Sequence, residues 1–386
     1  MTTVTIPAAD GRTRQITMNA PAELAVSARP ATSRTAYAAA HVVAQPWTAS
    51  AEGGCVDIDW DATMAARRRL FALGLGVAES MDTAQRGMGL GWSEARELAG
   101  RTLREAAAHD GRVVVGVATD QLAADARPGL SEVIDAYVEQ VASIEELGGR
   151  VVLMASRHLA AVAASPADYL RVYSSVIQQA QNPVVLHWLG EAFDPALRGY
   201  WGGTDLDVAA DTVVDLIAAH HDRVEGIKMS LLDAGREVEL RRRLPDGVKL
   251  FTGDDYSYVD LIAGDGERHS HALLGAFAAV APFASAALAR LDAGDEAGFR
   301  EVLGPTQDLN RLIFTSPTRF YKTGIVWLAY LSGAQDHFRM IGGLESGRSL
   351  VHLAEVFRCA NDLGAFPDPE LAARRASATF GAHGVS

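Results

Sequence analysis

From residue 41 onward, short apolar runs alternate with longer amphipathic segments. The apolar runs are four to seven residues long, and most of them are rich in valine, isoleucine and leucine. They cover residues 41–44, 75–78, 112–117, 150–154, 183–187, 224–228 and 248–251, with a weaker eighth run near 274–280. Short runs of this kind are typical of strands that are buried on both faces. The pattern therefore predicts eight buried strands.

The segments between these runs carry helix start signals. Ser93-Glu94 and Ser131-Glu132 each open an amphipathic segment, and Ser165-Pro166 puts proline at the first helical position. Successive apolar runs begin roughly 24 to 42 residues apart, which is about the length of one strand and its helix. Eight such units in a row predict an α/β fold, a (β/α)8 TIM barrel.

Both ends of the chain fall outside this repeat. Residues 3–6 and 14–18 alternate about an Asp10-Gly11 turn, which predicts a small hairpin. After the eighth unit, helical patterns follow over residues 283–293, 296–303, 307–314, 319–331 and 350–363. We therefore expect an N-terminal appendage over residues 1–40, the barrel over 41–282, and a helical C-terminal extension over 283–386 that packs on the barrel.

Charge and composition narrow the range of partners. The formal net charge of −13 provides no basic surface for nucleic acid or for an anionic membrane. No apolar run is long enough for a membrane-spanning helix, and the N-terminus lacks the apolar stretch of a signal peptide. Cys55 and Cys359 provide neither a disulfide framework nor a metal cluster. These features predict a cytoplasmic protein that acts on a small molecule.

Lysine is rare in this chain. Only Lys228, Lys249 and Lys322 are lysines among 35 basic residues, a bias that we ascribe to base composition. A lysine amine, unlike a guanidinium, can lose its proton and attack a carbonyl carbon. Lys228 ends the sixth predicted strand, at the end of the barrel where TIM-barrel chemistry takes place. We expect Lys249 to be solvated and Lys322 to be structural. Lys228 is therefore the candidate nucleophile, unless Asp82 or Asp254 holds it in a buried ion pair.

Six stretches of the chain, in the right order, resemble the dihydrodipicolinate synthase and N-acetylneuraminate lyase superfamily, which are class I aldolase-type barrels. The chain looks like a divergent, longer branch. The stretches are Gln45-Pro46-Trp47, Ile58-Asp59-Trp60-Asp61, Gly226-Ile227-Lys228, Thr252-Gly253-Asp254-Asp255, residues 275–282, and the helix with Pro317, Lys322 and Leu328-Ala329-Tyr330-Leu331. The resemblance implies a lyase or aldolase in which Lys228 forms a Schiff base without a cofactor. It also implies a homo-oligomer, a dimer or a tetramer.

The chain departs from that family in two places. After the second strand the family binds the carboxylate of a 2-oxo acid with Gly-Thr-Thr-Gly-Glu, of which only Thr83 carries over here. Asp82 would repel a pyruvate carboxylate by about 1 kcal/mol or more unless Arg86 neutralises it. We therefore expect a neutral keto or aldehyde substrate, such as a sugar derivative, rather than pyruvate. The family's proton-shuttling tyrosine after the fourth strand is also missing, because Ala155-Ser156-Arg157-His158 stands there.

Other side chains at the strand ends are candidates for the missing roles. His187 ends the fifth predicted strand, and an imidazole with a pKa of about 6.5 suits proton transfer. We predict that His187 or Asp82 moves protons for Lys228. The side chains expected to contact substrate are Thr83, Gln85, Arg86, His158, Asp254 and Asp255.

Two other functions fit the same sequence. Glu79, Asp82, His187 and Asp254 form a set of oxygen ligands with one imidazole, which suits a divalent metal with Lys228 as acid or base. No HxH or HExxH spacing supports such a site. The other alternative is a barrel without catalysis that binds or senses a metabolite.

Overall fold

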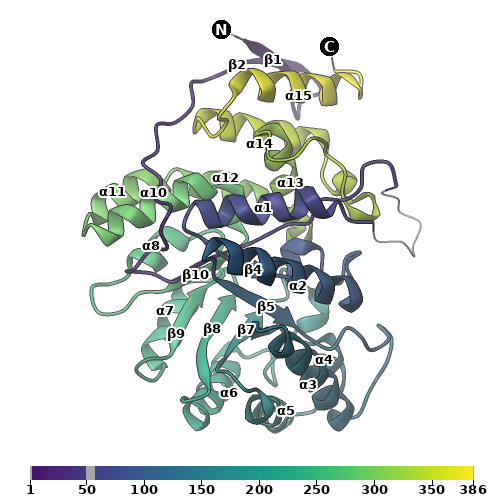
Figure 1. The fold of residues 1–386 in the computed structure, drawn as a ribbon, viewed down its shortest axis with the longest axis vertical. Coiled ribbons are helices and arrows are strands. Elements are labelled where there is room, and N and C mark those ends of the chain that lie inside the picture. Colours follow the sequence, from purple (N-terminus) through teal and green to yellow (C-terminus); the bar gives the residue numbers. More distant parts are fainter. Residues whose placement is uncertain (1, 49–56, 386) are drawn as a thin grey trace.

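The computed structural model describes residues 2–48 and 57–385, so Cys55 lies outside the described residues. Within this part, eight parallel strands close into a barrel in the order β10-β3-β4-β5-β6-β7-β8-β9 (Figure 1). The predicted (β/α)8 TIM barrel is confirmed. The barrel strands are β3 (Ala36–Ala39), β4 (Gly76–Glu79), β5 (Val113–Val117), β6 (Arg150–Leu153), β7 (Val184–Leu189), β8 (Val224–Ser230), β9 (Lys249–Thr252) and β10 (His271–Leu274).

Helices cover the outside of the barrel between successive strands. They are α1 (Trp60–Ala72), α2 (Trp92–His109), α3 (Leu130–Glu146), α4 (Arg157–Val162), α5 (Pro166–Gln179), α6 (Leu206–Ala219), α7 (Ala234–Arg243) and α8 (Tyr258–Ala263), with short 3-10 turns η1 (Asp82–Ala84) and η2 (Pro195–Leu197). The helix start signal at Ser165-Pro166 corresponds to a capping contact in the structure. At α5, the backbone N–H of Ser165 donates to Asp168 Oδ2 at 3.1 Å, and Pro166 follows in the first turn.

The first barrel strand lies earlier than the apolar pattern predicted. It is β3 rather than residues 41–44, so the barrel begins inside the predicted N-terminal appendage. Val42 is buried against α1 and the segment before it instead of in the sheet. The backbone N–H of Val43 donates to Thr63 Oγ1 at 3.0 Å, so this run satisfies its polar groups outside the ladder. Its β-branched residues therefore marked burial, not a strand.

The eighth strand is also earlier than predicted. Residues 271–274 form β10, whereas most of the predicted run at 274–280 forms the short helix α9 (Ala276–Ala279). Alanine has the highest helix propensity and a poor strand propensity, which accounts for the difference.

The C-terminal extension is helical, as predicted. After α9 it contains α10 (Ala281–Asp292), α11 (Glu296–Leu303), α12 (Thr306–Ile313), η3 (Thr318–Phe320), α13 (Tyr321–Leu331), η4 (Ile341–Gly347), α14 (Leu350–Asp362) and α15 (Pro369–Gly381). Neither η4 nor α15 had been predicted. The N-terminal hairpin of β1 (Thr3–Pro7) and β2 (Thr13–Thr17) lies beside α14 and α15, at the far side of the extension from the barrel (Figure 1). Asn361 of α14 fixes it there, because its side chain donates to Thr17 O at 3.0 Å.

Side chains on each strand alternate between the barrel interior and the helix layer. Ala78 joins the interior layer, whereas Glu79 points outward and is fully buried. Two hydrogen bonds of 2.9 Å join Arg67 of α1 to Glu79, and Thr102 of α2 donates to the same carboxylate at 2.5 Å. This ion pair ties two helices to β4.

None of the helices formed by residues 2–48 and 57–385 combines the length and the apolar character that crossing a membrane requires.

The buried pair predicts a large loss of stability for Glu79→Gln. Removing the carboxylate charge leaves the Arg67 guanidinium buried without its counter-ion, which costs about 3–5 kcal/mol. Urea denaturation should show this loss in the free energy of unfolding. The control is Glu97→Gln, which removes the partner of Arg101 from an exposed pair and should cost under about 1 kcal/mol. Equal losses for the two variants would contradict the prediction.

Candidate active site

Lys228 lies inside the barrel, near the C-terminal end of β8. In the sheet it is opposite His187 of β7 on one side and Phe251 of β9 on the other. Lys228 is only 8% exposed, and it lines a small, partly open cavity. The polar side chains that share this cavity are Asp82, Thr83, Ser230, Asp255 and Tyr321.

Burial lowers the pKa of Lys228, while the charges of Asp82 and Asp255 act in the opposite direction. Neither carboxylate is an ion-pair partner: among the described residues, no Asp or Glu oxygen lies within 4.0 Å of the Lys228 amine. The alternative that the sequence left open, a buried ion pair of Lys228 with Asp82 or Asp254, is therefore not formed. An amine in this setting loses its proton more easily than a solvated lysine and is free to react.

The glycine of the Thr252-Gly253-Asp254-Asp255 stretch is required by the approach of Lys228. A Cβ atom at Gly253 would lie 2.1 Å from Ser230 Oγ and 2.8 Å from Lys228 Cε. Any side chain at Gly253 would therefore displace the lysine. The two aspartates that follow have different surroundings.

Asp255 faces the Lys228 cavity, whereas Asp254 builds the loop. The Asp255 carboxylate accepts a hydrogen bond from Ala276 N at 2.8 Å, and burial raises its pKa to about 7 against the opposing effects of that bond and of Lys228. Asp254 Oδ1 accepts hydrogen bonds from the backbone N–H groups of Tyr256 and Ser257, at 2.8 and 3.0 Å. Asp254 does not line the Lys228 cavity.

Asp82 and Thr83 reach the cavity from the turn after β4, as the sequence predicted. Thr83 Oγ1 and the Tyr321 hydroxyl are hydrogen-bonded at 2.8 Å. Tyr321 comes from α13, and burial raises its pKa well above the ordinary value. Sequence analysis missed this tyrosine. Its only signal was its position directly before Lys322 in a segment that resembles the family.

His187 sits next to Lys228 and is fully buried. Its Nε2 is 3.2 Å from Ser230 Oγ, and its Nδ1 has no hydrogen-bond partner among the described residues. Burial, and then the charge of Lys228, hold the pKa of His187 well below its usual value. The imidazole is therefore neutral at pH 7.

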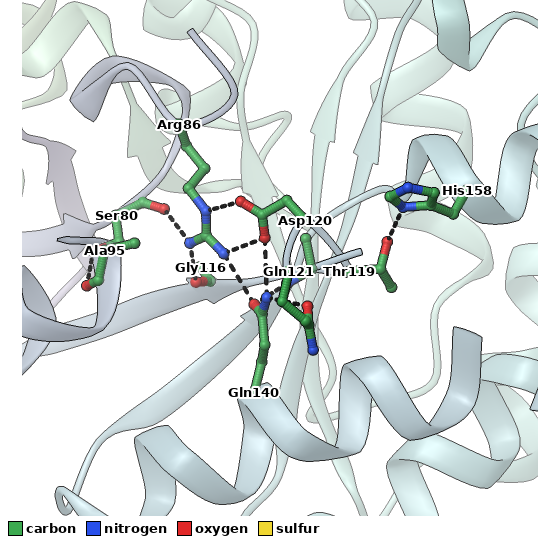
Figure 2. A network of polar contacts seen from close by, with 10 residues as sticks. Ser80, Arg86, Ala95, Gly116, Thr119, Asp120, Gln121, Gln140 and His158 are labelled. Atoms are coloured by element: carbon green, nitrogen blue, oxygen red, sulfur yellow. Dashed lines mark hydrogen bonds and ion pairs between the residues drawn. The ribbon is translucent and has the colours of Figure 1, made fainter. Parts of the chain in front are cut away.

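His187 also lines a larger cavity of about 940 Å³, which adjoins the Lys228 cavity at Asp82 and Leu189. A chain of hydroxyl groups stands on its wall. Ser156 Oγ is 2.6 Å from Thr119 Oγ1. Thr119 Oγ1 is in turn 2.9 Å from His158 Nδ1 (Figure 2). His158 Nε2 is 2.9 Å from Ala123 O, so Nε2 carries the hydrogen and Nδ1 accepts one from Thr119.

Arg86 and Gln85, which were expected to contact substrate, are engaged by other parts of the protein. The Arg86 guanidinium binds Asp120 through two hydrogen bonds, of 2.5 and 2.6 Å, and also donates to Gln140 Oε1 at 2.9 Å (Figure 2). Its charge is therefore committed to Asp120 and does not neutralise Asp82. The Gln85 amide donates to Met88 O and Ile341 O, and Gln85 lines neither of the two cavities.

The four proposed metal ligands are not brought together. Glu79 points out of the barrel to Arg67, and Asp254 is held in its own turn. Across residues 2–48 and 57–385, no three His, Cys, Asp or Glu side chains are grouped as metal ligands would be. The residues present therefore do not fit the metal site of the alternative function.

Comparisons with known proteins give a family and a fold for this chain. A family model described as a protein of unknown function (DUF993) matches residues 4–385. The comparison with curated proteins finds no match.

Solved structures of dihydrodipicolinate synthases share the fold. A putative dihydrodipicolinate synthetase from Pseudomonas aeruginosa is 17% identical, with a TM-score of 0.61 over 84% of this chain and 98% of its own. The chloride-inhibited enzyme from Acinetobacter baumannii, solved with pyruvate, is 15% identical, with a TM-score of 0.64 over 86% of this chain and 99% of its own. The enzyme from Aquifex aeolicus is 13% identical, with a TM-score of 0.61 over 91% and 98%. At these identities the likeness establishes the fold. The chain therefore belongs to the DUF993 family, whose barrel here has the dihydrodipicolinate synthase fold.

Proposed function

We propose that this protein is a Schiff-base-forming lyase or aldolase, of the class I type, that acts on a small carbonyl compound. The observation that carries the proposal is Lys228, a buried amine that lines a small polar cavity and has no ion-pair partner among the described residues. The dihydrodipicolinate synthase fold supports it, because class I aldolase chemistry is what the resemblance of the sequence implies. We infer no metal or dissociable cofactor in the reaction.

The proposed reaction begins with attack of the neutral Lys228 amine on the substrate carbonyl carbon. The carbinolamine that forms takes up a proton at its oxygen and loses water, which leaves a protonated imine. The carbon–carbon bond next to the imine carbon then breaks: the hydroxyl on the departing carbon loses its proton, that fragment leaves as a carbonyl compound, and the electron pair converts the imine into an enamine. The enamine takes up a proton at carbon, and hydrolysis of the resulting imine returns the free lysine. These proton transfers need a donor and an acceptor near Lys228.

Asp82 and His187 are the proposed proton carriers. Asp82 lines both the Lys228 cavity and the larger one, so its carboxylate can carry protons between them. The neutral His187 has an unpartnered Nδ1 and is able to accept a proton. The Tyr321 hydroxyl, which is hydrogen-bonded to Thr83, is a third polar group in the Lys228 cavity. We propose it as a substitute for the family's proton-shuttling tyrosine, which this chain lacks.

We further propose that the reacting end of the substrate is uncharged. Asp82 lies where the family has a threonine that binds carboxylate, and Arg86 is engaged by Asp120. We also propose that the enzyme works in the cytoplasm as a homo-oligomer, a dimer or a tetramer.

Borohydride trapping tests the nucleophile. With pyruvate, dihydroxyacetone and glyceraldehyde as probes, reduction should add the mass of at least one probe less one oxygen atom to the peptide that holds Lys228, because imine formation releases water and reduction adds two hydrogens. A prior treatment with chelator should leave the adduct unchanged. Lys228→Arg should give no adduct, whereas Lys249→Arg, changed at the opposite end of the barrel, should keep it. Adducts that persist in Lys228→Arg would sink the proposal.

The charge of Asp82 is tested by the concentration of pyruvate that gives half-maximal trapping. Asp82→Asn should lower this concentration by about tenfold, because about 1.4 kcal/mol of repulsion corresponds to that factor. The control is Asp308→Asn, which removes a carboxylate whose side chain is 84% exposed and does not line the Lys228 cavity. If pyruvate is trapped as readily by the parent as by Asp82→Asn, repulsion by Asp82 is not what selects the substrate.

The raised pKa of Asp255 predicts a pH dependence of stability. Its pKa is about 7 in the folded protein and has an ordinary value of 3.8, so the folded state holds this proton more tightly. As pH rises from about 4 to about 7, the unfolded chain has lost the proton that the folded chain keeps, and the stability contributed by Asp255 falls. Relative to Asp255→Asn, which keeps an acceptor for Ala276 N, the parent should lose unfolding free energy across this interval.

Urea denaturation at several pH values measures that difference. Asp308→Asn, at a side chain that is 84% exposed, serves as the control and should follow the parent at every pH. A constant difference between the parent and Asp255→Asn from pH 4 to pH 7 would show that Asp255 ionises normally.

A further inference from the structure

A third cavity adjoins the Lys228 cavity at Asp82, Phe193 and Tyr321. Its volume is about 780 Å³, and it lies where the turn after β4 meets the N-terminal end of α13. Four cationic side chains and two carboxylates line it: Arg86, Arg157, Arg319, Lys322, Asp82 and Asp194.

Only part of this positive charge is neutralised. Arg86 is paired with Asp120, and Arg157 with Asp194. Arg319 rests against the ring of Phe320, with 4.9 Å between the guanidinium carbon and the ring centroid. Within the described part of the chain, neither Arg319 nor Lys322 has an ion-pair partner.

Lys322 is the more unusual of these two cations because it is only 3% exposed. Its amine donates to Arg319 O at 3.0 Å and lies 3.4 Å from Met88 Sδ and 4.7 Å from the centroid of the Tyr321 ring. None of these partners carries a negative charge. Burial of an unpaired ammonium group is costly unless an anion compensates it. Burial accordingly lowers the pKa of Lys322 to about 8, against the opposing charge of Asp82.

Asp82 stands between the two buried lysines. It lines both cavities, and its charge acts on Lys228 and on Lys322 alike. Asp194 is already engaged in an ion pair. Among the described residues that line the Lys322 cavity, Asp82 is therefore the carboxylate that remains to oppose two unpaired cations, Arg319 and Lys322. The Lys322 side therefore holds an excess of positive charge. That excess is the feature an anionic ligand would complement.

We propose that the cavity around Lys322 and Arg319 binds an oxyanion, a phosphate or a carboxylate, at the end of the substrate remote from its reacting carbonyl. This inference rests on the proposed function, since it names the substrate class of the same site. It departs from a substrate that is neutral throughout: the end beside Asp82 is uncharged, and the far end is anionic. Arg319 is exposed at the mouth and meets the oxyanion first, while Lys322 binds it at the inner wall.

Calorimetric titration with inorganic phosphate tests the site without any chemistry at Lys228. Lys322→Met should weaken phosphate binding at least tenfold, and Arg319→Gln should weaken it at a residue whose exposure makes misfolding a poor explanation. Lys249→Met removes a lysine from the other end of the barrel and should bind phosphate as the parent does. Lys228→Met should also retain binding. Phosphate affinities that are equal in the parent, Lys322→Met and Arg319→Gln would overturn the inference.

Trapping at Lys228 then separates the two oxyanions and the two proposals. The parent should reach half-maximal trapping at a concentration at least tenfold lower with dihydroxyacetone phosphate than with dihydroxyacetone, or with succinic semialdehyde than with butanal. The pair that shows the difference identifies phosphate or carboxylate. In Lys322→Met the ratio should fall towards one.

The possible failures point to different proposals. In one failure, the anionic and the neutral probe of each pair reach half-maximal trapping at the same concentration, in the parent and in Lys322→Met. That result would refute the oxyanion site and leave the Schiff base intact. Phosphate binding that depends on Lys322, without any trapping at Lys228, would refute the proposed lyase and leave the oxyanion site.

Discussion

Desolvation of the Lys228 amine inside the closed barrel is the constraint on which the rest of the site depends. The parallel register of β7, β8 and β9 puts Lys228 beside His187 and Phe251, and the absence of a side chain at Gly253 makes room for its methylene chain. Asp82 and Asp255 are close enough to oppose the lowering of its pKa, yet neither forms an ion pair with it in the described structure. The amine therefore loses its proton more easily than a solvated lysine. The same burial raises the pKa of Asp255 and lowers that of His187.

The helical extension completes this site, although it follows the barrel in the chain. Tyr321 of α13 bonds Thr83 from the turn after β4, and Lys322 lines the adjoining cavity. Two segments more than 200 residues apart therefore share one wall. Barrel loops alone would leave this side open, so α13 contributes both to the shape of the cavity and to its charge.

The charged residues near the strand ends divide according to the direction in which they point. Side chains that face outward, such as Glu79, meet arginines of the helix layer and tie helices to the sheet. Side chains on the following turns, such as Asp82, face the cavities. Arg86 belongs to the turn but is captured by Asp120 and Gln140. A charge at a strand end is available for chemistry only when no opposite charge of the scaffold reaches it.

The sequence by itself determined the fold and placed Lys228 at the C-terminal end of a barrel strand. The periodicity of strands and helices predicts the barrel, since a strand buried on both faces needs a continuous apolar run. The rarity of lysine and its position in the chain single out Lys228. Local composition misplaced only the first and last strands, because valine-rich and alanine-rich runs report burial and propensity rather than pairing. Asp82, Thr83 and Asp255 follow strands whose ends meet at one mouth, and all three line the Lys228 cavity.

Only the tertiary structure decided which polar side chains remain available to a substrate. Glu79, Gln85, Arg86 and Asp254 looked equally available in the sequence, but each is engaged by a partner from another part of the chain or by its own turn. Tyr321 and Lys322 became part of the site for the converse reason, because α13 packs over the mouth. Hydrogen bonds and ion pairs between distant segments depend on three-dimensional packing, which a local pattern of residues does not encode.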